Sequence, residues 1–139
     1  MNGWKSDELE RIGAAEEIQI AARRRASTLR DPVPVWVVRR GDDLYVRSVN
    51  GRTAAWFRGT QVTHGGRIRA GGITKDVTFE VAGGEIDEEI DAAYRAKLGA
   101  RYPSIVPRIV SPTARAATLK LTPRAAEERA ASGDMITLR

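Results

Sequence analysis

Residues 33–49 read VPVWVVRRGDDLYVRSV, and this stretch decides the fold class. β-Branched and aromatic residues fill both of its flanks, as is typical of strands. Between them, Gly41-Asp42-Asp43 has the composition of a tight turn. The stretch therefore predicts a β-hairpin. Pro32 and Pro34 place the start of its first strand at a sheet edge or rim, because proline cannot donate to a strand ladder.

Period-two alternation predicts further strands on both sides of this hairpin. They cover residues 17–22, residues 67–70 and 74–81 around a Gly71-Gly72 turn, and residues 116–122, ended by Pro123. The strand before the first hairpin would connect to it through a turn at Ala26-Ser27.

Helical spacing predicts two main helices. The first runs from Ser6 to about Ala15, with Ser6 or Asp7 as its N-cap. The second covers residues 87–98, is capped by Asp87 and carries an apolar stripe. The stripe consists of Ile86, Ile90, Tyr94 and Leu98. One or two helical turns are expected within 52–59, and the prolines at 103, 107 and 112 exclude a long helix there.

Six strands in hairpins with two or three helices predict a mainly β (α+β) domain, a small six-stranded antiparallel barrel. Closing the sheet removes exposed strand edges. The barrel would occupy residues 1–124, and residues 125–139 would form a polar C-terminal tail.

Composition excludes several kinds of site. The chain of 139 residues has no cysteine and a single histidine, so we expect no disulfide, no thiolate or multi-histidine metal site and no cysteine nucleophile. No apolar run approaches the roughly 20 residues of a membrane span, and the first residues lack a signal-peptide core. We therefore expect a cytoplasmic protein without a membrane role.

The positive charge is concentrated in the middle of the chain. Residues 23–75 hold twelve basic and three acidic residues, a net charge of +9, whereas residues 1–22 carry −3 and residues 76–139 carry −1. Such a block attracts nucleic acid, membrane headgroups or a phosphorylated small molecule. The alternative is a solvated, arginine-rich barrel exterior.

Four residues in this block suit a phosphate site. Arg47, Ser48, Asn50 and Arg52 surround a predicted turn, and arginine offers a donor fork that matches phosphate oxygens. A solvated strand end is the alternative. Trp56 lies on a short, glycine-bounded element where an aromatic ring often covers a pocket mouth.

Acid–base candidates are few. His64 is the one side chain whose unperturbed pKa lies near neutrality, although an exposed loop position is the commoner outcome. If the chemistry needs no cofactor, His64, Tyr45 or Asp76 would carry it.

The quoted hairpin also carries a family resemblance. Residues 34–48, 91–97 and 117–121 resemble an uncharacterised bacterial family, domain of unknown function 2255, and the likeness runs from about Trp4 to Arg124. The family has no assigned chemistry, so this resemblance implies relatives but no reaction.

The order of the predicted elements is similar to that of the flavin-binding split barrels, which include pyridoxamine-phosphate oxidase-like and deazaflavin-dependent reductase proteins. In that group a hydroxyl at the end of the third strand and cations near the next helix bind the cofactor phosphate. The matching positions are Ser48 for the hydroxyl and Arg47, Arg52 and Arg58 for the cations. The chain departs from the group at its first turn, where Ala26-Ser27 replaces Asp-Gly.

This second resemblance implies a split barrel that forms a homodimer and binds FMN or a deazaflavin between its subunits, with Trp56 and His64 near the reacting ring. We therefore expect a small-molecule-binding protein, with a flavin- or deazaflavin-dependent oxidoreductase as the first interpretation. The alternatives are a cofactor-free enzyme or binding protein for an organic anion, and a nucleic-acid-binding module.

Overall fold

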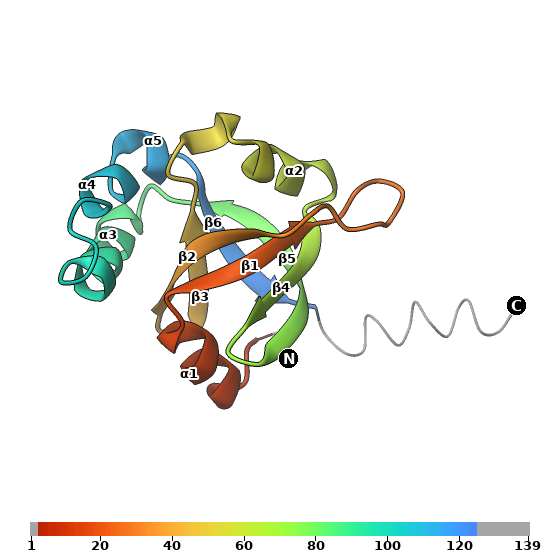
Figure 1. Cartoon of the computed structure of the whole chain (residues 1–139), viewed down its shortest axis with the longest axis horizontal. Coiled ribbons are helices and arrows are strands. Elements are labelled where there is room, and N and C mark those ends of the chain that lie inside the picture. The colour runs from red at the N-terminus through yellow and green to blue at the C-terminus, as the bar shows by residue number, and fades with distance from the viewer. Residues whose placement is uncertain (1–2, 125–139) are drawn as a thin grey trace, which may run out of the picture.

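A closed antiparallel barrel of six strands forms the centre of the molecule, in the order β1-β2-β3-β6-β5-β4 (Figure 1). This computed structural model describes residues 3–124, and the predicted tail 125–139 lies outside them. The strands are β1 Glu17–Ala22, β2 Val33–Arg40, β3 Asp43–Arg47, β4 Gly65–Ala70, β5 Ile73–Ala82 and β6 Thr118–Pro123. The predicted six-stranded barrel is confirmed.

Five α-helices and one 3-10 turn surround the barrel in residues 3–124. They are α1 Ser6–Ala14, η1 Gly51–Thr53, α2 Ala55–Thr63, α3 Asp87–Leu98, α4 Val106–Ile109 and α5 Pro112–Arg115. The helices α4 and α5 were not predicted as separate elements. Each is a single turn with a proline in its first two residues, where the missing N–H costs no hydrogen bond.

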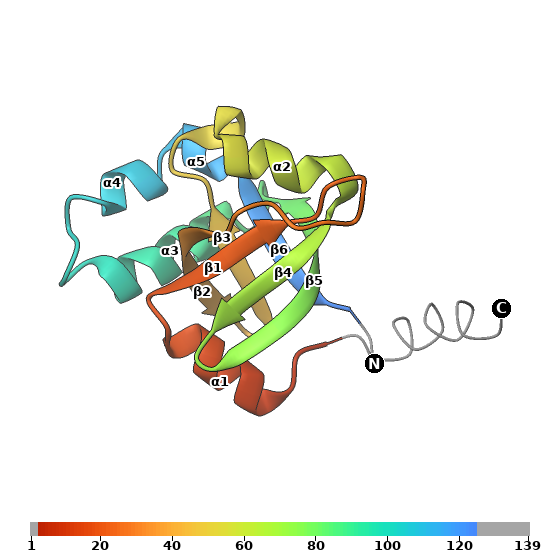
Figure 2. The same cartoon turned by 45° about the vertical axis from the view of Figure 1, so that its right-hand side comes forward.

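The helices cover three parts of the barrel (Figures 1 and 2). Helix α1 lies at one end, η1 and α2 cover the opposite end, and α3 to α5 lie along one side. None of the helices in the described part of the chain is both long and apolar enough to cross a membrane.

Both predicted helix caps are wrong, because each helix is capped by the residue before the predicted positions. Helix α1 begins at Ser6 with Lys5 as its N-cap, and the Glu8 carboxylate accepts a hydrogen bond of 2.9 Å from the Lys5 backbone N–H. Helix α3 begins at Asp87 with Ile86 as its N-cap. The carboxyl group of Asp87 is therefore available for contacts outside its own helix.

Strand β2 changes partner halfway along its length. Residues 33–36 pair with β1 and residues 37–40 pair with β3. Pro34 lies in the first half, opposite Gln19 of β1. Positive φ angles at Gly41 (61°) and Gly71 (56°) close the two predicted hairpins.

Alternation along β3 divides the apolar residues between two cores. Leu44 and Val46 point into the barrel, where the larger hydrophobic cluster lies. Tyr45 points outward and packs with Tyr94 and the rest of the α3 stripe. Ile90, Tyr94 and Leu98 are all buried, so the predicted stripe of this helix is confirmed.

Helix α3 is also tied to the barrel by polar contacts. The Tyr94 hydroxyl donates to the Trp36 carbonyl at 2.9 Å, and Lys97 Nζ donates to the carbonyls of Gly13 and Val37. Burial lowers the pKa of Lys97 to about 8. These bonds fix the orientation of α3, and with it the acidic residues at its N-terminal end.

Candidate anion-binding pocket

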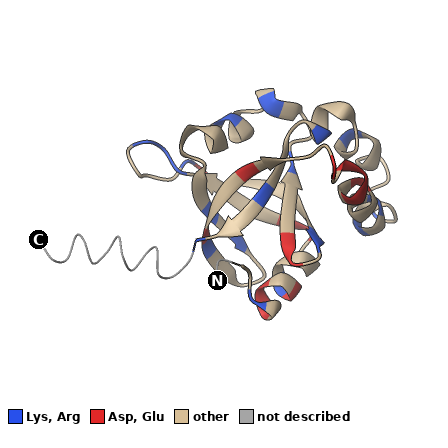
Figure 3. Ribbon diagram, turned by 180° about the vertical axis from the view of Figure 1, so that it is seen from behind, with Lys and Arg blue, Asp and Glu red and all other residues tan. Residues whose placement is uncertain are grey.

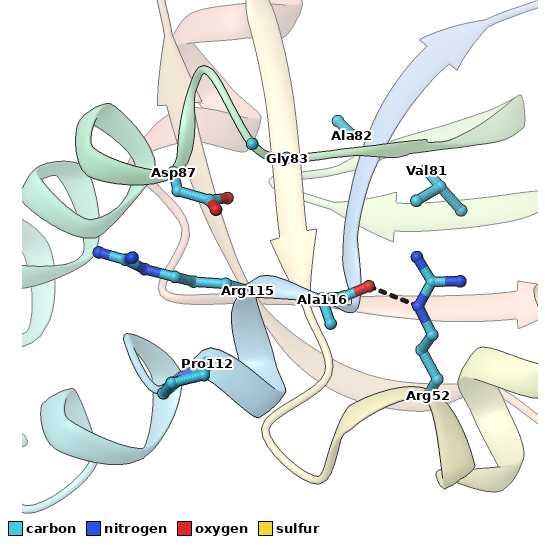
Figure 4. A pocket seen from close by; sticks show the side chains of 9 residues that line it. Arg52, Val81, Ala82, Gly83, Asp87, Pro112, Arg115 and Ala116 are labelled. Atoms are coloured by element: carbon cyan, nitrogen blue, oxygen red, sulfur yellow. Dashed lines mark hydrogen bonds between the residues drawn. The ribbon is translucent and has the colours of Figure 1, made fainter.

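A pocket of about 580 Å³ opens where β5 leaves the barrel, α3 begins, and η1 approaches α5. Figure 4 shows it from close by, with side chains from all of these elements. Its wall combines two arginines and one carboxylate with small apolar groups. The lining residues are Arg52, Val81, Ala82, Gly83, Gly84, Asp87, Pro112, Arg115 and Ala116.

Arg52 supplies the first cation of the pocket. Its Nε donates to the Ala116 carbonyl at 2.7 Å, which leaves both terminal nitrogens without a hydrogen-bond partner in residues 3–124. The preceding Gly51 has φ of 81°, and a Cβ there would meet the Thr113 side chain at 2.5 Å. Glycine at this turn therefore lets η1 pack directly against α5 and brings Arg52 to the pocket.

Arg115 supplies the second cation, and Asp91 holds it. Both Nε and Nη2 of Arg115 donate to Asp91 Oδ2, the first at 3.1 Å. The side chain of Arg115 is 37% exposed, whereas that of Asp91 is buried. The hydrogen bond with Asp91 raises the pKa of Arg115. Arg115 therefore presents a fixed positive charge at the edge of the pocket.

Arg47, a predicted phosphate ligand, is buried behind the pocket wall. Its Nη1 donates to Asp91 Oδ1, its Nε donates to Thr118 Oγ1 at 2.9 Å, and its Nη2 lies 3.6 Å from Asp87 Oδ1. Backbone carbonyls of Asp87 and Ile109 accept from its terminal nitrogens. The chain's own carboxylates therefore occupy the position that we expected a phosphate to take.

The charges of this cluster balance. Burial alone raises the pKa of Asp91, but hydrogen bonds from Arg115 and Arg47 outweigh it and hold the pKa below its ordinary value. Asp87 and Asp91 face the two arginines, so the formal charges of the cluster sum to zero. Arg115 is the arginine of this cluster whose side chain reaches the pocket.

The other residues predicted to bind the cofactor phosphate or to flank its ring do not line the pocket. The Ser48 side chain is 1% exposed, and its Oγ has no hydrogen-bond partner among the described residues. Asn50 is exposed before η1. Trp56, on α2, is half-buried and packs against the barrel core. Of the predicted set, Arg52 alone lines this pocket.

The two predicted catalytic residues lie on different elements. Tyr45 is 4% exposed in the core between β3 and α3, and burial raises its pKa. His64 is exposed at the C-terminal end of α2, in a left-handed conformation with φ of 60°. Neither residue lines the pocket.

Sequence reasoning missed Asp87, Asp91 and Arg115 as site residues. One signal could have found the first two: they are four residues apart in a predicted helix and therefore share a face. A carboxylate buried on that face, as Asp91 is, requires cations from elsewhere. The contact with Arg47 spans 44 residues of sequence and has no local signal.

Solved structures share this split-barrel fold with the chain at low sequence identity. HutZ, the heme storage protein from Vibrio cholerae, is 14% identical over 87% of this chain and 91% of its own, with a TM-score of 0.61. An F420 reductase is 10% identical over 84% and 93%, with a TM-score of 0.52. The FAD and heme binding protein from Mycobacterium smegmatis is 17% identical over 93% and 78%, with a TM-score of 0.51.

Within this class, residues 8–121 match the family described as an uncharacterized protein conserved in bacteria (DUF2255), and the chain belongs to that family. The predicted family membership is confirmed. No curated protein matches the sequence.

Proposed function

We propose that this chain is a small-molecule-binding split barrel whose ligand carries a phosphate or another anionic group. The observation that carries the proposal is the pair of arginines, Arg52 and Arg115, on the wall of one pocket. Arg52 has two terminal nitrogens free to donate, and arginine is well matched to phosphate and carboxylate oxygens. The pocket volume of about 580 Å³ lies in the range of small-molecule sites.

The ligand class that we propose first is a flavin or a deazaflavin. Proteins of the same fold are named for F420, FAD and heme. The pocket fits such a group in two respects. Arg52 and Arg115 would hold its phosphate, while Val81, Ala82 and Pro112 offer apolar surface to a ring system. A bound flavin or deazaflavin would supply hydride transfer, and the protein would supply orientation and charge.

In this proposal Arg47 does not touch the ligand. It holds Asp91 in place, and Asp91 in turn holds Arg115 at the pocket.

The roles predicted for the other residues remain predictions. Contact of Ser48, Asn50 or Trp56 with a cofactor phosphate or ring, and acid–base roles for His64 and Tyr45, are untested. A homodimer with a shared site and a cytoplasmic location are likewise untested.

A cofactor-free organic-anion-binding protein is the second candidate. One observation favours it: no aromatic side chain of residues 3–124 lines the pocket, so none would stack on a flavin ring there. A small carboxylate or phosphate compound would need the two arginines but no stacking partner. Acid–base chemistry in that case would require Asp87 or a residue brought by a second subunit.

Thermal unfolding with and without ligand tests the proposal, because a ligand that binds only the native state raises the melting temperature. FMN, FAD, a deazaflavin and heme would each be added to the purified chain. We expect at least one of the flavin-type ligands to raise the melting temperature, and Arg52→Gln to abolish the rise. Arg95→Gln is the matched control, since Arg95 is exposed on α3 and does not line the pocket.

A colourless protein whose melting temperature does not respond to any flavin-type ligand would contradict the cofactor proposal. A response to small phosphorylated or carboxylated compounds that depends on Arg52 would then favour the second candidate. An equal loss of response in Arg52→Gln and Arg95→Gln would contradict the assignment of the site to this pocket.

A further inference from the structure

A second groove with two arginines lies between α2 and the β1–β2 loop. Its volume is about 290 Å³, and it is lined by Arg30, Ala55, Arg58, Gly59 and Val62. No carboxylate lines it. It shares no lining residue with the pocket at Arg52 and Arg115. This groove therefore requires an explanation of its own.

The loop that carries Arg30 is held against the barrel. The backbone N–H of Arg30 donates to the carbonyl of Ala22, the last residue of β1, at 2.8 Å. Within the loop, the backbone N–H of Arg24 donates to the Thr28 carbonyl at 2.7 Å, and Arg24 Nη1 donates to the Leu29 carbonyl at 3.0 Å. The loop thus has internal bonds that fix the base from which Arg30 extends.

Gly59 makes room for the Arg30 side chain on the surface of α2. A glycine inside a helix is less favourable than alanine by about 1 kcal/mol, yet this buried position has one. A Cβ at Gly59 would meet Cδ and Nε of Arg30 at 3.0 Å. The side chain of Arg30 therefore lies across α2 at a place where a Cβ would make it shift by a few tenths of an ångström.

The charge around the groove is unbalanced. In residues 3–124, neither Arg30 nor Arg58 forms an ion pair. Helix α2 has no acidic residue, and the loop at 23–32 has four arginines and one acid, Asp31, which does not line the groove. Figure 3 shows basic segments on both the loop and α2. Two like charges on one groove repel each other, and a bound anion would relieve that repulsion.

We propose that this groove binds the phosphate or pyrophosphate group of a small anion, independently of the pocket at Arg52. Arg30 and Arg58 supply the donor forks from two different elements, and Gly59 sets the position of the first. Ala55 and Val62 add apolar surface for a short uncharged part of the ligand. Arg58 is one of the cations that the split-barrel resemblance matched to a cofactor phosphate, and the structure places it in this groove rather than in the pocket at Arg52. Because the two sites share no lining residue, the proposed function and this inference can fail separately.

Calorimetric titration of the full chain with sodium pyrophosphate, at constant ionic strength, tests this site. Arg58→Gln and Arg30→Gln should each weaken binding about tenfold or more, as loss of a charge-assisted hydrogen bond implies. Gly59→Ala should weaken it too, although it leaves the charge unchanged, and its melting temperature will show that it folds. Arg25→Gln is the matched control, because it removes the same charge from the same loop outside the groove.

Several results would overturn the inference. The first is the absence of pyrophosphate binding, and the second is an equal effect of Arg25→Gln and Arg58→Gln, which would indicate diffuse attraction. Binding that is lost in Arg52→Gln but unchanged in Arg58→Gln would assign the anion to the other pocket and leave the proposed function standing. Binding of a single-stranded oligonucleotide without binding of pyrophosphate would assign this surface to nucleic acid instead.

Discussion

Asp91, on α3, pairs its carboxylate with the guanidinium of Arg47 at the end of β3, and both residues are 1% exposed. Burying either charge alone would cost several kcal/mol. Here each is compensated, because Arg47 also bonds Thr118 and two backbone carbonyls while Asp91 also accepts from Arg115. The pair therefore joins the barrel to the helices that form one side of the candidate pocket.

Replacing Asp91 with asparagine should strongly destabilise the fold. Asp91→Asn keeps the shape of the side chain but leaves Arg47 buried beside a neutral amide, and breaking a buried pair costs about 3–5 kcal/mol. Urea unfolding at pH 7 measures the loss. Glu89→Gln on the same helix is the control, since Glu89 pairs with Arg40 in solvent, and exposed pairs contribute little. An Asp91→Asn midpoint equal to that of Glu89→Gln would contradict the assigned role.

The same pair predicts how stability depends on acid. Hydrogen bonds from Arg115 and Arg47 overcome the effect of burial and hold the folded pKa of Asp91 below its ordinary value of 3.8. As the pH falls, the unfolded chain therefore takes up this proton first, so acid favours unfolding. The contribution of Asp91 is complete above about pH 5 and is lost as the pH falls through the folded pKa.

Urea unfolding of the native chain and of Asp91→Asn between pH 6 and pH 2 checks this expectation. The difference in unfolding free energy between the two should be constant near neutrality and shrink below about pH 4. A difference that stays constant to pH 2 would show that Asp91 does not titrate in this way.

These predictions concern the part of the molecule that sequence patterns did not indicate. Strands follow from patterns that each segment carries by itself, such as the β-branched and aromatic residues of 33–49 and the alternation of 74–81. The α3 stripe follows from spacing within one helix. Contacts between Arg47, Asp91 and Arg115 depend on how three distant segments pack. Arg47 was predicted to bind phosphate because the residues around it suit a phosphate site. Local sequence cannot show that the guanidinium of Arg47 is already paired with the carboxylate of Asp91.

The position of the pocket has a similar explanation. Arg52 follows the Asn50-Gly51 turn, which sequence analysis recognised, so it was found as a candidate. Arg115 lies in a proline-bounded single turn, where patterns of hydrophobicity are too short to predict which way a side chain points. The close contact of Gly51 with Thr113, which brings these two elements together, is a property of the packed structure.

Two adjacent glycines offer a test of the barrel seam between β1 and β4. A Cβ at Gly66 would meet the Ala21 carbonyl oxygen at 2.4 Å and the Phe79 ring at 2.8 Å, whereas a Cβ at Gly65 meets nothing closer than 3.8 Å. Gly66→Ala should therefore destabilise the barrel by about 1–3 kcal/mol or more, as overpacking does, and Gly65→Ala should not. Thermal and urea unfolding compare the two. Equal stability of both variants would contradict the close approach of these strands.

Two buried hydroxyl groups near Arg47 differ in their contacts: that of Thr118 forms hydrogen bonds within the site, and that of Ser48 forms none among the described residues. Thr118 Oγ1 accepts from Arg47 Nε at 2.9 Å and donates to the Arg115 carbonyl at 2.8 Å. The buried Ser48 Oγ has no partner in residues 3–124. Thr118→Val should cost about 1–3 kcal/mol, because a buried donor of Arg47 loses its acceptor. Ser48→Ala should be neutral or slightly stabilising, since it removes a buried hydroxyl that forms no hydrogen bond.

The ligand response of the same two variants checks the sequence prediction for Ser48. If its hydroxyl binds a cofactor phosphate, Ser48→Ala will reduce the ligand-induced rise in melting temperature without loss of stability. Its 1% exposure leads us to expect no reduction, whereas Thr118→Val should reduce the rise because Arg115 loses a support. A reduced response in Ser48→Ala would show that the segment around β3 opens to the ligand, and would return Ser48 to the binding site.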